Sequence, residues 1–105
     1  MNSFVTIYEF DAKAGVTDQD MRACEPALDR FLKAQPGFMY RSLIKKASGQ
    51  WIDLYYWRDE ASAEAISQPF MESEAGQSFL ALIDLPSTTV TKSVVLSESI
   101  GPECG

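Results

Sequence analysis

The sequence lacks histidine altogether and is poor in basic residues. Without histidine, the chain shows no nucleophile–base pair of the kind that covalent catalysis uses. Nine lysines and arginines stand against fifteen acidic residues, which gives a net charge of −6. Lys45 and Lys46 are the only adjacent basic pair, with Arg41 shortly before them, and this is too little for the basic stripe that nucleic acid requires. We therefore expect no nucleic-acid partner.

Cysteine and long hydrophobic runs are also scarce. The spacing of the two cysteines, Cys24 and Cys104, matches neither a CxxC pair nor a metal site. We expect free thiols in a reducing compartment, and a disulfide between them is the alternative. The longest uncharged run late in the chain, Ala75–Ile83, is too short to span a bilayer. No secretory signal pattern opens the chain, so we predict a soluble cytoplasmic protein without a membrane partner.

The stretch Trp51–Trp57 has the alternation of a β-strand and holds both tryptophans of the chain. Successive side chains of a strand point to opposite faces of the sheet. One face of this strand carries Trp51, Asp53, Tyr55 and Trp57, and the other carries Ile52, Leu54 and Tyr56. Because both faces bear large side chains, we place this strand in the middle of a sheet that is covered on both sides.

Three more strands are predicted at residues 4–10, 38–46 and 88–96, where β-branched and aromatic residues gather. With a helical region on either side of the central hairpin, the order is β-α-β-β-α-β, the ferredoxin-like arrangement of the α+β class. Residues 1–105 are thus expected to form a single domain, with residues 97–105 as a loose tail.

Each helical region is expected to be interrupted. The first begins after the N-cap Thr17, kinks or restarts at Pro26, and ends before Gly37. The second begins near Asp59 and runs to Leu85-Pro86, in two pieces joined near Gln68-Pro69, with Gly76 as a weak point.

The predicted sheet has one face that its own helices do not cover. Right-handed crossovers place both helices on the same face of a four-stranded antiparallel sheet. The other face would expose the apolar side chains of Leu43, Ile52, Leu54 and Tyr56. An apolar face of that size is an association site, so we predict a homodimer through the helix-free sheet face, in which the two sheets make a barrel. The alternative is a monomer whose polar edge residues and long lysines cover this face.

Several short motifs, taken in order, resemble the dimeric α/β-barrel superfamily, and in particular its small members similar to antibiotic-biosynthesis monooxygenases. They are Gln35-Pro36-Gly37-Phe38 before the second strand, Trp57 at the end of the third, the acid- and alanine-rich 58–65, and Pro69-Phe70. The resemblance spans nearly the whole chain. It implies a pocket between sheet and helices, lined by the strand-end tryptophan, here Trp57.

The chain departs from the family pattern at two positions. The family has an asparagine on its first strand, and the position closest to it here is Tyr8. The haem-degrading members use a histidine on the second helix, and this chain has none. Ligation of haem by imidazole is therefore excluded, and we expect neither a cofactor nor a metal.

The predicted pocket combines aromatic and polar side chains. Its members are Thr6, Tyr8, Tyr40, Asp53, Tyr55, Trp57 and Phe70. Asp53 is the candidate base, and Tyr8 or Tyr55 would donate to a developing oxyanion. Thr6, Tyr40, Trp57 and Phe70 would contact the ligand. This set suits a cofactor-independent monooxygenase acting on a small aromatic or phenolic molecule.

Other interpretations stay open from the sequence. The tyrosines could reach the rim of the pocket while Asp53 pairs with Arg41 across the hairpin. The protein could be a non-catalytic or stress-related small-molecule binder, or a structural dimer with a filled interior.

Overall fold

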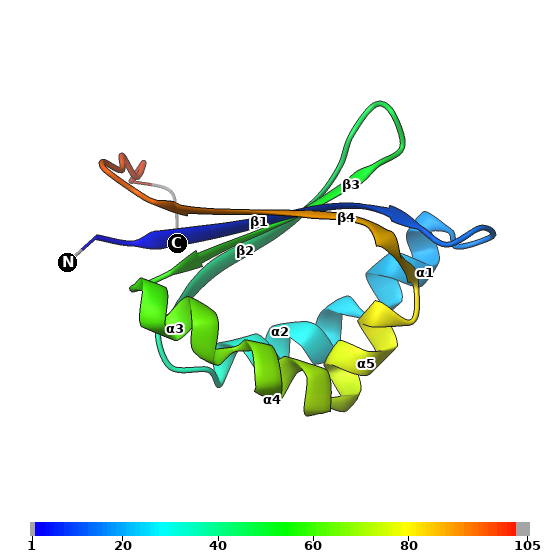
Figure 1. Cartoon of the computed structure of the whole chain (residues 1–105), viewed down its shortest axis with the longest axis horizontal. Coiled ribbons are helices and arrows are strands. Elements are labelled where there is room, and N and C mark those ends of the chain that lie inside the picture. Colours follow the sequence, from blue (N-terminus) through cyan, green and yellow to red (C-terminus); the bar gives the residue numbers. More distant parts are fainter. Residues whose placement is uncertain (1, 103–105) are drawn as a thin grey trace.

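Four antiparallel strands form one sheet in the order β2-β3-β1-β4. The strands are β1 (Phe4–Ala12), β2 (Phe38–Lys45), β3 (Trp51–Trp57) and β4 (Ile83–Val94). The computed structural model describes residues 2–102. In Figure 1 all the helices lie below this sheet, and its upper face carries none. The predicted four-stranded antiparallel sheet with its helices on one face is confirmed.

Strand β3 lies in the interior of the sheet, and its odd-numbered side chains face the helices. Trp51, Asp53, Tyr55 and Trp57 are buried, and the residues between them are partly exposed. The predicted bounds of this strand agree with the structure. Apolar core clusters lie along this face, one around Phe10 and Met21 and one around Trp57.

The first helical region consists of α1 (Asp18–Ala23) and α2 (Glu25–Lys33), as the restart at Pro26 predicts. Thr17 caps α1 in a capping box, in which its hydroxyl accepts from the Asp20 N–H and the Asp20 carboxylate accepts from the Thr17 N–H. Pro26 lies in the first turn of α2, where its missing N–H costs no hydrogen bond.

The second helical region is divided into three helices rather than the expected two. They are α3 (Glu60–Ala65), α4 (Ser67–Glu72) and α5 (Glu74–Leu80). The extra break comes at Ser73, whose extended backbone and side chain cap α5. The sequence-based prediction missed this break because it followed the apolar spacing and not the capping serine.

The predicted boundary between the last helix and the last strand is wrong. Helix α5 ends at Leu80, and β4 begins at Ile83 instead of at residue 88. The strand passes through Pro86 because it lies at the edge of the sheet, where a missing N–H is tolerated. A register shift between Glu9 and Asp11 accommodates it, and the Ser87 hydroxyl accepts the Asp11 N–H at 2.8 Å.

The predicted facing of β2 is also wrong. A register shift between Phe38 and Tyr40 inserts an extra residue, which exchanges the two faces of the strand after it. Tyr40 therefore pairs with Tyr56 on the helix-free face and is 56% exposed, and Leu43 packs against the core on the helix side.

The chain beyond β4 has no regular secondary structure over residues 95–100. Cys104 and the end of the predicted tail lie outside the described residues, so the state of this thiol stays a prediction. None of the helices formed by residues 2–102 is long and apolar enough to cross a membrane.

Candidate functional site

A cavity of about 270 Å³ lies between the sheet and the helices. Its sheet side is formed by Thr6, Tyr8, Phe10, Asp53, Tyr55, Trp57, Ile83, Leu85, Thr88 and Val90, and its helix side by Ile66, Ser67, Phe70, Met71, Phe79 and Leu80. An apolar cavity of roughly 150 Å³ accepts benzene. This larger space therefore has room for a flat molecule of two or three fused rings.

The cavity opens between α4 and the edge strand β4. Met71 on α4 and Leu85 and Val90 on β4 all line the cavity, and each is about half exposed or more. None of these apolar rim residues was predicted as a site residue. Leu85 was assigned to the second helical region, whereas Met71 and Val90 lie in a helix and a strand that the sequence predicted. A ligand would enter along this rim.

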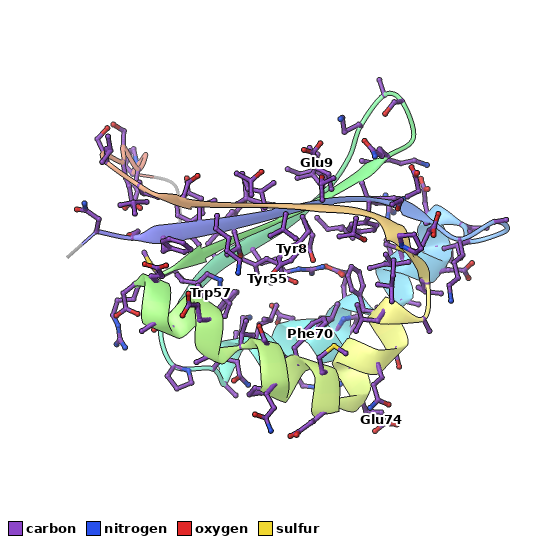
Figure 2. The ribbon with its side chains drawn as sticks, viewed as in Figure 1. Tyr8, Glu9, Tyr55, Trp57, Phe70 and Glu74 are labelled. Carbon is purple, nitrogen blue, oxygen red and sulfur yellow. The ribbon has the colours of Figure 1, made fainter. Side chains whose placement is uncertain are left out.

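Six of the seven predicted pocket residues line this cavity: Thr6, Tyr8, Asp53, Tyr55, Trp57 and Phe70. In Figure 2, Tyr8 and Tyr55 lie on the helix side of the sheet, and Phe70 lies across from them on α4. Tyr40 lies on the opposite face, where its hydroxyl accepts a hydrogen bond from Ser42 at 2.6 Å. Its predicted place in the pocket is a mistake that follows from the bulge in β2.

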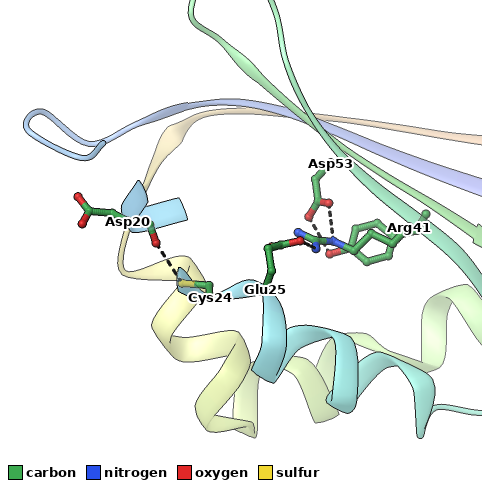
Figure 3. A network of polar contacts seen from close by, with 6 residues as sticks. Asp20, Cys24, Glu25, Arg41 and Asp53 are labelled. Carbon is green, nitrogen blue, oxygen red and sulfur yellow. Dashed lines mark hydrogen bonds and ion pairs between the residues drawn. The ribbon is translucent and has the colours of Figure 1, made fainter. Parts of the chain in front are cut away.

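Asp53 is the centre of a buried polar network (Figure 3). Its Oδ1 accepts from Arg41 Nε at 2.7 Å, and its Oδ2 accepts from the Tyr55 hydroxyl at 2.7 Å. Arg41 Nη1 in turn donates to Glu25 Oε1 on α2, also at 2.7 Å. The pairing of Asp53 with Arg41, open as an alternative in the sequence, is thus present. Glu25 was not predicted, since no sequence pattern links α2 to β2.

Burial and charge act on the ionisation of this network in opposite directions. Burial raises the pKa of Asp53, while the Arg41 guanidinium and the Tyr55 hydroxyl act to lower it, and the net shift is upward. Burial would lower the pKa of Arg41, but the Asp53 carboxylate, Tyr55 and Glu25 together raise it. Arg41 therefore keeps its proton, and Asp53 is a stronger base than a solvated aspartate.

Two tyrosines surround the carboxylate on the cavity side. Tyr8 and Tyr55 meet edge to face, with ring centroids 5.8 Å apart. Burial raises the pKa of Tyr8, and the negative charge of Asp53 adds to this effect. Burial and the same charge raise the pKa of Tyr55. Both phenols are therefore protonated near neutral pH. Tyr8 can donate to a ligand, and Tyr55 donates to Asp53.

Trp57 forms the wall at one end of the cavity and is 1% exposed. Its ring lies parallel to that of Tyr55, with centroids 6.2 Å apart, and meets Phe38 edge to face. Its indole N–H is buried without an acceptor among the residues that the structure describes. These neighbours fix the orientation of the indole, so Trp57 offers a rigid apolar surface.

Within residues 2–102, no three histidine, cysteine, aspartate or glutamate residues are grouped as metal ligands would be. The carboxylate nearest the cavity, Asp53, already accepts hydrogen bonds at both oxygens. The residues that line the cavity can hold a flat apolar molecule and exchange a proton with it.

Comparisons by sequence find no relative of this chain: no protein-family model matches it, and no curated protein does so significantly. Comparisons by structure find many similar folds. SnoaB, a cofactor-independent oxygenase from Streptomyces nogalater, is 13% identical and aligns over 98% of this chain and 100% of its own, with a TM-score of 0.63.

Two further solved structures share the fold. A dimeric ferredoxin-like protein from an uncultured marine organism is 11% identical over 96% of this chain and 94% of its own, with a TM-score of 0.64. A haem-degrading protein from Mycobacterium tuberculosis is 15% identical over 95% of this chain and 98% of its own, with a TM-score of 0.68. These neighbours share the fold of this chain, as the resemblance of the sequence motifs implied.

Proposed function

We propose that this protein is a cofactor-independent monooxygenase that oxidises a small, flat aromatic or phenolic molecule. The observation that carries the proposal is the Asp53–Tyr55 pair at the wall of a largely apolar cavity. A neutral core would place aliphatic side chains there, because a buried carboxylate is unfavourable unless it is paired. The fold shared with an oxygenase that needs no cofactor agrees with this assignment but does not by itself carry a function.

The first step in this proposal is removal of a proton from the bound substrate. The substrate hydroxyl, such as that of the enol form of an anthrone, donates to Tyr55 Oη. Tyr55 passes its own proton to Asp53 Oδ2, to which it is already bonded. Asp53 is suited to accept this proton because burial raises its pKa. The protonated Tyr8 then donates to the substrate oxyanion.

The second step is the reaction of the electron-rich anion with oxygen. One oxygen atom bonds to the ring carbon opposite the oxyanion and becomes a new carbonyl. The other oxygen atom leaves as water, with the two protons lost from the substrate. For an anthrone this gives the anthraquinone, and the substrate supplies all four electrons that reduce O₂. Thr6, Trp57 and Phe70 contact the rings and exclude water from the anion.

We extend the proposal to the assembly: two copies pack through their helix-free sheet faces and form a barrel. The face carries Val5, Ile7, Tyr40, Ile44, Ile52, Leu54 and Tyr56 by the register of the sheet. Tyr40 and Ile44 are 56% and 42% exposed in the single chain, and their burial against an identical face would be favourable. A dimeric neighbour with this fold is in keeping with the proposal.

An oxygen electrode with anthrone as substrate tests the proposed activity. The protein, stripped of metals with a chelator, is expected to consume one O₂ per anthrone and to release anthraquinone. Asp53→Asn and Trp57→Ala are expected to reduce the rate. A rate equal to that of anthrone in buffer alone would reject the proposal.

A second candidate function is non-catalytic binding of the same class of molecule. It is favoured by the hydrogen bonds that already occupy both Asp53 oxygens within the protein. Saturable binding of anthrone with no oxygen uptake by the unaltered protein would identify a binder.

A further inference from the structure

The walls of the cavity carry a single charged residue. Asp53 is the only charged side chain among the described residues that line it. The nearest cation, Arg41, does not line the cavity and lies behind Asp53, with a side chain that is 7% exposed. An anionic ligand would therefore meet a carboxylate at the wall and no cation.

Arg41 cannot compensate for a second anion, because it already serves two carboxylates. Its Nε bonds to Asp53, and its Nη1 bonds to Glu25. One guanidinium between two carboxylates leaves this network with a formal charge of −1. In a confined apolar site, where charge interactions are stronger than in water, this excess repels a negative ligand.

The hydrogen bonds at the wall also have a direction. The Tyr55 hydroxyl uses its only proton to bond Asp53 Oδ2, at 2.7 Å. Its oxygen is left with lone pairs and therefore accepts from a ligand. A ligand that donates a proton extends the chain from its own hydroxyl through Tyr55 to Asp53. At Tyr55, a ligand with only acceptor atoms would place two acceptors against each other.

We infer that the cavity selects neutral flat molecules that carry a hydroxyl donor and rejects those that carry a carboxylate. This inference deepens the proposed function and rests on the same cavity being the ligand site. Substrates with an acid group would then have to be esterified or decarboxylated by another reaction before this protein acts on them.

Isothermal titration calorimetry with three matched two-ring ligands tests the inference without any turnover. At pH 7, 2-naphthol is neutral, since phenols ionise near pH 10, and it donates a proton. The ligand 2-naphthoate is anionic, and 2-methoxynaphthalene is neutral without a donor. We expect 2-naphthol to bind at least tenfold more tightly than 2-naphthoate and about three- to tenfold more tightly than the methyl ether.

Two variants locate the cause of the discrimination. Asp53→Asn removes the charge at the wall and is expected to reduce the preference for 2-naphthol over 2-naphthoate at least threefold. Glu25 does not line the cavity, and Glu25→Gln removes one negative charge from the network and makes it neutral. This variant is also expected to reduce the preference for 2-naphthol over 2-naphthoate. It also serves as the test if Asp53→Asn does not fold, because Glu25 is 37% exposed at its side chain.

Equal or tighter binding of 2-naphthoate by the unaltered protein would overturn the inference, and so would failure of all three ligands to bind. Equal affinity for 2-naphthol and its methyl ether would overturn the requirement for a donor. If the expected preference is found but anthrone is not oxidised, the selectivity stands and the proposed oxygenase activity falls.

Discussion

At the scale of single residues, Asp53 is an ionisable group held from two sides. A buried carboxylate is tolerated when hydrogen bonds and an opposite charge replace its hydration. Arg41 provides a hydrogen bond and a positive charge on the side away from the cavity, and the Tyr55 hydroxyl donates to the Asp53 carboxylate on the cavity side. Arg41 also lies over the rings of Tyr55 and Phe79, at 5.6 and 5.4 Å. The network therefore fixes the position of the Tyr55 hydroxyl.

Tyr55→Phe removes the hydroxyl that joins the ligand to Asp53. We expect the oxygen uptake with anthrone to fall about 100-fold or more, because proton transfer to a positioned base contributes effects of that size. The free energy of unfolding is expected to fall by about 1–3 kcal/mol, since a buried acceptor loses its donor. Rates from the oxygen electrode and urea denaturation measure the two effects.

Tyr56→Phe is the matched control for this variant. Tyr56 is the next residue along β3 and points to the opposite face. The variant loses a hydroxyl on that face only, so its rate of oxygen uptake should be within about twofold of that of the unaltered protein. Similar losses in the two variants would mean that Tyr55 acts only through stability.

Glu25→Gln is expected to shift the acidic limb of the pH–rate profile. Burial, opposed by Arg41, raises the pKa of Asp53, and the negative charge of Glu25 adds to the rise. Removal of that charge lowers the pKa of Asp53, so that the ionised base persists to lower pH. The acidic limb of kcat/KM should therefore move to lower pH.

Asp29→Asn provides the control on the same helix, because Asp29 pairs with exposed Lys33 and not with Arg41. Its profile should coincide with that of the unaltered protein. A shift to higher pH in Glu25→Gln would show that Asp53 is not the group that titrates.

At the scale of the elements, the joint between α4 and α5 sets the helix side of the cavity. No residue of α4 is fully buried, yet its Phe70 lines the cavity. The Ser73 hydroxyl donates to the Phe70 carbonyl and accepts from the Gly76 N–H, both at 2.9 Å. A Cβ at Gly76 would overlap the Phe70 carbonyl. Only glycine allows this close approach.

Gly76→Ala is therefore expected to reduce the free energy of unfolding by about 1–3 kcal/mol, as overpacking of a close contact does. It should also weaken 2-naphthol binding, because Phe70 must move. Gly101→Ala, where a Cβ meets no atom within 4 Å, should change neither quantity. Thermal denaturation and calorimetry measure both, and an unaltered melting temperature in Gly76→Ala would contradict the role of the joint.

The β3 part of the site was predictable because the alternation of this strand is unbroken. Asp53, Tyr55 and Trp57 share a face by strand parity, and all three line the cavity. The errors come from elements where the register shifts. The bulge after Phe38 exchanges the faces of β2, and no residue type in that stretch predicts a bulge.

The edge strand shows a second limit of sequence patterns. Ile83 to Leu85 continue the apolar spacing of α5, so they were assigned to the helix. In the structure, these residues belong to the edge strand β4, because Ile83 pairs with Ala12 and Asp84 with Asp11. Tertiary pairing overrode local spacing here, and the Leu85 rim residue was missed for that reason.

At the scale of the whole molecule, the sheet has apolar side chains on both faces and helices on only one. Ile52, Leu54 and Tyr56 lie on the helix-free face of β3, next to Val5 and Ile7 of β1. Apolar faces of this kind associate, and the proposed dimer would stiffen the strands that carry Asp53 and Tyr55.

Leu54→Glu is expected to convert the dimer to a monomer, because it places a charge at the centre of the proposed interface. Light scattering at micromolar concentration would report half the mass of the unaltered protein. Ala61→Glu, exposed in the first turn of α3, adds the same charge away from this face and should leave the mass unchanged. A monomeric mass for the unaltered protein would contradict the assembly.

The central claim is that the cavity beside Asp53 and Tyr55 holds a flat aromatic molecule by its hydroxyl. A crystal structure of the protein soaked with 2-naphthol tests it most directly. The account predicts the rings between the sheet and Phe70, with the ligand oxygen within hydrogen-bonding distance of Tyr55 Oη. A ligand bound elsewhere while the cavity stays empty, or one whose oxygen points towards the α4–β4 rim, would contradict it.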